Sequence, residues 1–247
     1  MFYPMGPTPS ETWKILDVQL KCDIPKVFSI EKVVRVRDSV LITLRLLSPA
    51  SFRIIDMGSS FNYLSPGTYR SIDASRTSMG RGGGLNEEMI NLLLISWPRM
   101  REIMESDSHY LRLPAQRLLE GTERKKPEDA ILDYAIGLER LLTAGIENEL
   151  SYRFALRGAT ILSMEYGNKD QYYENLKNFY ALRSSIIHGS IRNKVHKLSP
   201  NDACLVGEDY LRRVWWWFFS NGFTDAKEGL TKGTKKIDDR ILSNFIR

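Results

Sequence analysis

The segment from residue 127 to residue 145 constrains the fold most, because it carries a complete set of helix signals. Pro127 fits the first helical position, where a missing N–H has no consequence. Glu128 and Asp129 suit the positive end of the helix dipole, and Gly145 suits the position just past the last turn. The apolar residues that share one face are Ile131, Tyr134, Ala135, Leu138, Leu141 and Leu142. The segment therefore predicts a helix that buries one side.

The sequence around this segment, from residue 85 to residue 222, is also typical of helices. Asn86 is a suitable cap for a helix that begins with Glu87 and Glu88 and that Pro98 breaks or kinks. Four further helices are predicted, over residues 109–121 ending at Gly121, 149–165, 170–188, and 202–220 with Gly222 just past its end.

The first 84 residues have a different pattern. The stretches 32–37, 40–47 and 51–55 are rich in β-branched residues with partial alternation, which favours strands. The glycine run at 80–84 lacks a P-loop lysine and is interpreted as a linker. We therefore expect an α+β protein with three parts: a smaller β-rich N-terminal domain of residues 1–84, an all-α domain of residues 85–224, and a polar, basic, solvated tail of residues 225–247.

Composition excludes several classes of protein. The chain has 247 residues and a formal net charge of +5; 43% of its residues are hydrophobic, as expected of a folded protein that can form a core. Cys22 and Cys204 belong to no Cys/His cluster, so we expect no metal site and no cofactor. Motifs of serine hydrolases, dinucleotide-binding folds and kinases are absent. The sequence shows no signal peptide and no run long enough to cross a bilayer, so we expect a cytoplasmic protein with no membrane partner.

Three charged residues interrupt the apolar stripes of the predicted helices. They are Glu139, Arg157 and Arg183, one on each of three successive helices. A buried charge without a partner costs several kcal/mol, so each one needs a counter-charge or a wet cleft. We expect Glu139 to pair with Arg157. Arg183 is then left to pair with Glu139 instead, to face a second subunit, or to line a cleft, five residues before His188 and Gly189 end the helix.

Three stretches of this region together resemble a known family. They are Ala130–Leu142, Glu149–Ala159 and Leu176–Gly189, the last of which has an arginine and a histidine separated by four residues. In this order they are similar to the HEPN domain (higher eukaryotes and prokaryotes nucleotide-binding), closest to its ApeA-like group, over residues from about 105 to 222.

This resemblance implies a small up-and-down helical bundle that forms a homodimer. Active HEPN proteins are metal-independent endoribonucleases, often toxins or phage-defence effectors that a regulatory protein or antitoxin restrains. By motif position, the resemblance assigns Arg183 and His188 to catalysis. Ser184, Tyr180, Glu139 and Arg157 are then expected to support the site.

These residue types suit RNA cleavage without a metal. The RNA 2′-OH attacks the adjacent phosphate, and a histidine can accept or donate the protons. An arginine stabilises the phosphorane charge. The loop that follows contains Arg192, Lys194, His196 and Lys197, which are expected either to hold the RNA backbone or to be a solvated loop.

Two other hypotheses remain open. The first is a non-catalytic HEPN module that binds nucleotide, RNA or a protein partner, and Ser184, which carries no charge, favours it. The second is a scaffold in which Trp215, Trp216, Trp217 and Phe218 form an interface, since four successive aromatic residues cover most of a helix circumference. For these four we expect packing inside the molecule, against the N-terminal domain.

Overall fold

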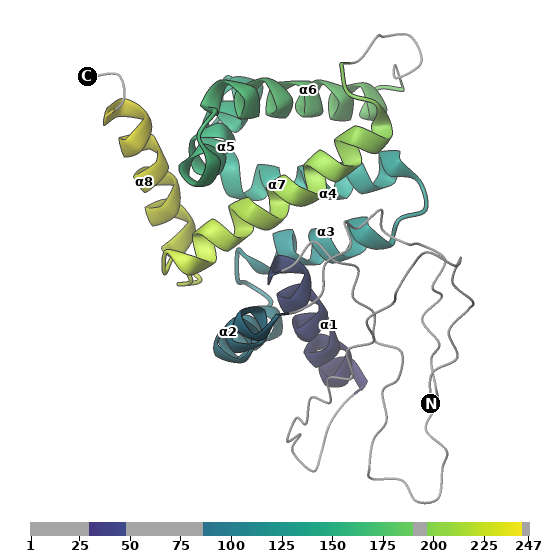
Figure 1. The fold of residues 1–247 in the computed structure, drawn as a ribbon, viewed down its shortest axis with the longest axis vertical. Helices are drawn as coiled ribbons and strands as arrows, with labels where there is room; N and C mark the ends of the chain where they lie inside the picture. The colour runs from purple at the N-terminus through teal and green to yellow at the C-terminus, as the bar shows by residue number, and fades with distance from the viewer. Residues whose placement is uncertain (1–29, 48–85, 190–196, 244–247) are drawn as a thin grey trace, which may run out of the picture.

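The computed structural model describes residues 30–47, 86–189 and 197–243 of the chain. These residues form eight helices and no strand (Figure 1). The helices are α1 (Ile30–Leu47), α2 (Glu87–Glu105), α3 (Arg112–Glu123), α4 (Pro127–Leu142), α5 (Leu150–Tyr166), α6 (Lys169–Ile187), α7 (Pro200–Ser220) and α8 (Gly229–Ser243).

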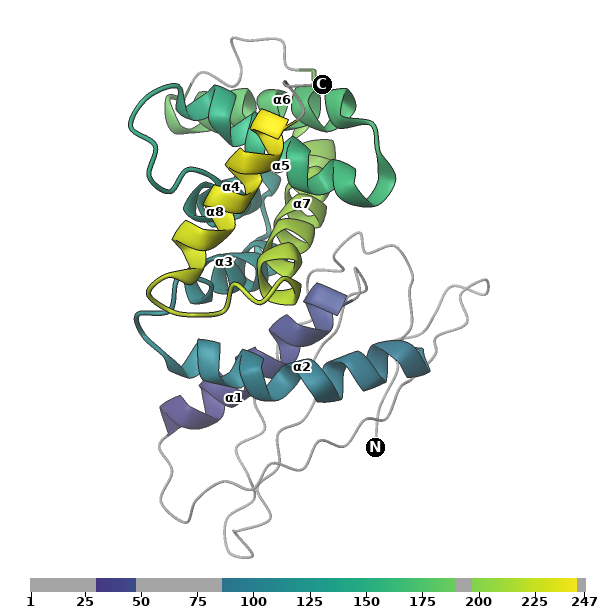
Figure 2. The same cartoon turned by 90° about the vertical axis from the view of Figure 1, so that its left-hand side faces the viewer.

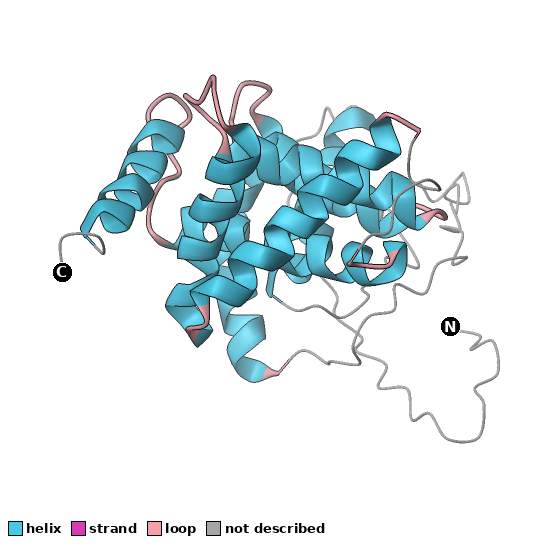
Figure 3. Ribbon diagram, turned by 90° about the horizontal axis from the view of Figure 1, so that it is seen from above, coloured by secondary structure: helices cyan, strands magenta, loops and turns pink. Residues whose placement is uncertain are grey.

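The α+β prediction is therefore wrong for the part of the chain that the structure describes. Residues 32–37 and 40–47, predicted as strands, lie in α1, and every regular element in Figure 3 is a helix. Ile42 and Leu46 are buried at a spacing of four, and the Thr43 hydroxyl donates to the Ser39 carbonyl at 2.6 Å. Packing of one helical face thus overrides the strand preference of β-branched residues. The predicted strand at 51–55 and the glycine linker at 80–84 lie outside the described residues.

The helices predicted after residue 85 are confirmed, with ends shifted by a few residues. Asn86 caps α2 by accepting a hydrogen bond from the Met89 N–H at 2.8 Å, and Pro127 lies in the first turn of α4. Pro98 lies inside α2, which continues beyond it to Glu105. Gly121 does not end α3 but lies within it, where the ring of Tyr134 leaves no room for a Cβ atom. Helix ends were thus predictable from local signals, whereas a glycine required by packing was not.

The core lies between α4 and the helices around it. In Figure 1, α7 crosses in front of α4, with α6 along one edge of the bundle and α1 and α2 beyond α3. The largest buried side chains are Trp215, Tyr134, Phe154, Phe179 and Phe218.

Two of the four successive aromatic residues in α7 belong to this core. Trp215 and Phe218 are fully buried, and the Trp215 indole N–H donates to the Leu111 carbonyl at 2.8 Å. Trp216 and Trp217 are half-buried, and the Trp217 ring packs against Phe223, 5.5 Å between centroids. The expected internal packing holds for Trp215 and Phe218. Leu111 and Phe223, which Trp215 and Trp217 contact, belong to the helical region and not to the expected N-terminal domain.

Residues 225–247 include α8, so the expectation of a solvated tail is wrong. Ile237 and Ile241 of α8 are buried, and the helix lies across α4, α5 and α7 (Figure 2). Its outer side is polar, which explains why its composition suggested a tail. Among the described helices, none has an apolar stretch that would cross a bilayer.

Candidate functional site

The candidate site lies at the C-terminal end of α6, where the bundle packs α6 against α4 and α5. Leu176, Phe179 and Leu182 are buried and fix the rotation of α6. This rotation places Arg183 beside α4 and leaves His188 exposed at the helix end.

Arg183 pairs with Glu139 of α4, which is one of the three alternatives that the sequence left open for it. The Arg183 Nη2 atom donates to Glu139 Oε2 at 3.0 Å. The two side chains are 23% and 22% exposed, so water reaches both. The predicted Glu139–Arg157 pair is wrong, and the alternative pairing of Arg183 with Glu139 is correct.

This ion pair is incompletely hydrogen-bonded within the described residues. Glu139 Oε1 and Arg183 Nε are buried and have no hydrogen-bond partner there. Burial raises the pKa of the Glu139 carboxyl, and Arg183 only partly opposes this shift. The Nε atoms of Arg112, Arg117 and Arg212 are also buried without a partner in the described part of the chain, so this feature does not by itself mark a site.

Tyr180 lies one turn before Arg183 and forms one wall of the site. The Arg183 guanidinium carbon lies 5.6 Å from the centre of the Tyr180 ring, a cation–π distance. Burial and then the Glu139 charge raise the pKa of the Tyr180 hydroxyl. Tyr180 thus lies against the Arg183 guanidinium, and its expected supporting role stays a prediction.

Arg157 does not belong to this site. It forms a bidentate pair with Asp238 of α8 at 2.8 and 2.6 Å. Its Nη1 atom also donates to the carbonyls of Leu142 and Ala144 at 2.9 and 3.1 Å. The side chain is 6% exposed, so its role is to join α8 to the end of α4.

His188 is the C-cap of α6, with its backbone N–H donating to the Ser184 carbonyl at 3.1 Å. Gly189 follows with a φ of 64°, a left-handed conformation that ends the helix as predicted. Among the described residues, no hydrogen bond or ion pair joins Arg183 to His188. Within one chain, the two candidate catalytic residues therefore share a helix end without contacting each other.

Of the four residues predicted to bind RNA, the structure describes Lys197. Arg192, Lys194 and His196 lie outside the described residues. Lys197 is described, and its exposed ammonium lies 3.9 Å from the carboxylate of Glu174, a contact that contributes little energy.

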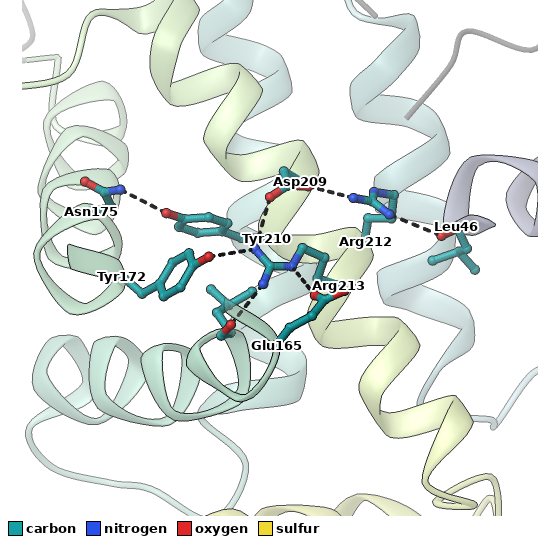
Figure 4. A network of polar contacts seen from close by, with 9 residues as sticks. Leu46, Glu165, Tyr172, Asn175, Asp209, Tyr210, Arg212 and Arg213 are labelled. Atoms are coloured by element: carbon teal, nitrogen blue, oxygen red, sulfur yellow. Dashed lines mark hydrogen bonds and ion pairs between the residues drawn. The ribbon is translucent and has the colours of Figure 1, made fainter. Parts of the chain in front are cut away.

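A second polar cluster, around Arg213 of α7, was missed in the sequence (Figure 4). Arg213 donates to Glu165 at 3.1 Å, to the Leu162 carbonyl at 2.9 Å and to the Tyr172 hydroxyl at 3.3 Å. Asp209 lies one turn before it, 3.5 Å away. Because protein groups surround this guanidinium, the cluster braces α7 against α5 and α6 and is not a candidate site.

Comparison with known proteins identifies no family for this chain. No family model, no curated protein and no solved structure matches the chain. Within residues 30–47, 86–189 and 197–243, no group of three or more His, Cys, Asp or Glu side chains could hold a metal ion.

Proposed function

We propose that the protein is a metal-independent endoribonuclease of the HEPN type. The observation that carries this proposal is the end of α6, where the half-buried Arg183 pairs with Glu139 and the imidazole of His188 is exposed. An arginine held in a fixed orientation and a solvent-accessible histidine are the two groups that cleavage by 2′-OH attack requires.

In this mechanism, Arg183 stabilises the phosphorane and His188 transfers protons. Glu139 and Tyr180 hold the Arg183 guanidinium, whose remaining N–H groups can meet the phosphate oxygens. Because Arg183 and His188 do not contact each other within one chain, two subunits supply the site, with one histidine as the base and the other as the acid. Such an enzyme acts on cytoplasmic RNA in phage defence or a toxin-type stress response, under the control of a regulatory protein or antitoxin.

The experiment is cleavage of end-labelled single-stranded RNA and of a tRNA pool in EDTA. We expect cleavage by the wild type that leaves 2′,3′-cyclic phosphate ends, and loss of cleavage in Arg183→Ala and His188→Ala. Lys235→Gln, an exposed change on α8, is the matched surface control. Equal cleavage by all variants would contradict the proposal, because the activity would then come from another site or a contaminant.

One observation favours a non-catalytic binding module as the second candidate. The Arg183 charge is already balanced by Glu139, and Ser184 adds no charge beside it. This alternative predicts that RNA or a nucleotide binds without being cut, and that His188→Ala binds as well as the wild type. RNA binding without cleavage, measured at protein concentrations high enough to form the dimer, would favour the binding module over the nuclease.

A further inference from the structure

A cavity of about 480 Å³ lies where the start of α5 meets α6. Its volume is in the range of small-molecule sites. The lining residues are Glu149, Leu150, Ser151, Tyr152, Tyr173 and Lys177. None of them belongs to the Arg183–Glu139 pair, so this cavity is a separate feature of the α6 surface.

Half of the lining residues, Leu150, Tyr152 and Tyr173, are apolar or aromatic, and the cavity is open to solvent. Tyr152 and Leu150 are 47% and 40% exposed. The ring of Tyr152 meets the ring of Tyr173 edge-on, with 6.2 Å between centroids and an angle of 72° between planes. Two perpendicular rings form a corner in which a third flat ring can stack on one and meet the edge of the other.

The charges around this corner favour an anion. Lys177 is exposed, and no ion pair is found for it among the described residues. The nearby Glu149 carboxylate lies 3.9 Å from the Arg153 guanidinium, so its negative charge is partly balanced. A flat ring attached to a phosphate is a nucleotide, and aromatic stacking beside a cation is how unpaired nucleotides are bound.

A stripe along α6 connects this cavity to His188. Lys177, Ala181, Ser184 and His188 follow at spacings of four, three and four, which places them on one side of the helix. Lys177, Ala181 and His188 are exposed, and Ser184 is half-buried. At 1.5 Å per residue, the stripe is about 16 Å long, enough for a few nucleotides of an extended strand.

We propose that this cavity binds an unpaired base of a single-stranded RNA whose backbone follows α6 to His188. The base stacks on Tyr152 and Tyr173, and Lys177 neutralises the adjoining phosphate. This inference rests on the proposed function, since it names the substrate as single-stranded RNA and assigns a subsite distant from the reacting phosphate.

The experiment measures binding without cleavage, by fluorescence anisotropy of labelled RNA in the His188→Ala background. A series of single-stranded oligonucleotides, from a dinucleotide to a dodecamer, should show a step of about tenfold or more in affinity at the length that reaches the cavity. Adding Tyr152→Ala should abolish this step, whereas Tyr152→Phe, which keeps the ring, should retain it. Lys177→Gln should weaken binding and its salt dependence, and Lys235→Gln should not.

The outcomes separate this site from the nuclease. A step that survives Tyr152→Ala, or the absence of RNA binding at every length, overturns the base subsite whatever the cleavage assay shows. If Tyr152→Ala abolishes the step and the wild type cuts no RNA, the base subsite is supported and the proposed nuclease activity is contradicted. Equal binding of a duplex and a single strand also overturns it, because a paired base cannot enter the corner.

Discussion

Two arginines on neighbouring helices, Arg157 and Arg183, meet their counter-charges in different ways. Arg157 is 6% exposed and donates to Asp238 and to two carbonyls. Arg183 is 23% exposed and donates to one carboxylate oxygen, with its Nε atom buried and without a partner in the described residues. The first arginine donates through Nε, Nη1 and Nη2 to groups of the fold, while the second donates through Nη2 to Glu139.

The largest loss of stability is expected on replacing Arg157, because this side chain donates to more acceptors than Arg183 does. Arg157→Ala should lower the free energy of unfolding by about 3 kcal/mol, because it leaves two carbonyls and the Asp238 carboxylate without their donor. Urea unfolding measures this change. Arg153→Ala, an exposed change on the same helix, is the control and should shift stability by less than about 0.5 kcal/mol. Similar values for both variants would show that α8 contributes little to the fold.

The pH dependence of stability sharpens the comparison at Arg183. Burial raises the pKa of Glu139 above its ordinary value of 4.5 in the folded state, so the folded protein binds the proton more tightly than the unfolded chain. The stability that protonated Glu139 contributes is therefore fully present below pH 4.5 and is lost as the pH rises through the pKa of Glu139 in the folded protein. We expect Glu139→Gln to remove this loss, so the variant gains stability relative to the wild type as the pH rises above 4.5. A relative loss over this range would mean that Arg183 outweighs the cost of burial.

The smallest expected changes in stability come from removing the hydroxyl groups of two tyrosines. Tyr172→Phe removes an acceptor from Arg213 and should cost about 1 kcal/mol. Tyr180→Phe should cost less than about 0.5 kcal/mol, because the Tyr180 hydroxyl has no hydrogen bond among residues 30–47, 86–189 and 197–243. Thermal unfolding of the two variants gives the comparison, and a larger loss for Tyr180→Phe would reverse it.

What the sequence predicted well depended on local signals. The cap at Asn86, the first-turn proline at Pro127 and the left-handed glycine at Gly189 act within one turn, and each one marked a real helix end. Helix α1 was missed because its β-branched residues favour strands until packing at Ile42 and Leu46 decides otherwise.

Partners distant in the chain were the harder problem. Asp238 is 81 residues from Arg157, and no spacing rule connects them. A signal for α8 was nevertheless present, because Leu230, Thr234, Ile237 and Ile241 recur at spacings of four, three and four. In the candidate site, spacing suggested that Arg183 and His188 share a helix end, but only the packing of α6 against α4 chose Glu139 as the partner of Arg183.

The pair between Arg157 and Asp238 also bears on how the protein is made. A ribosome adds about 5–20 residues per second, so the 81 residues between the two take on the order of ten seconds to synthesise. Helices α6 and α7 are synthesised during that interval, while Arg157 lacks the carboxylate with which it pairs in the folded protein. Until Asp238 has been added, the only acceptors available to Arg157 among those it uses in the folded protein are the carbonyls of Leu142 and Ala144.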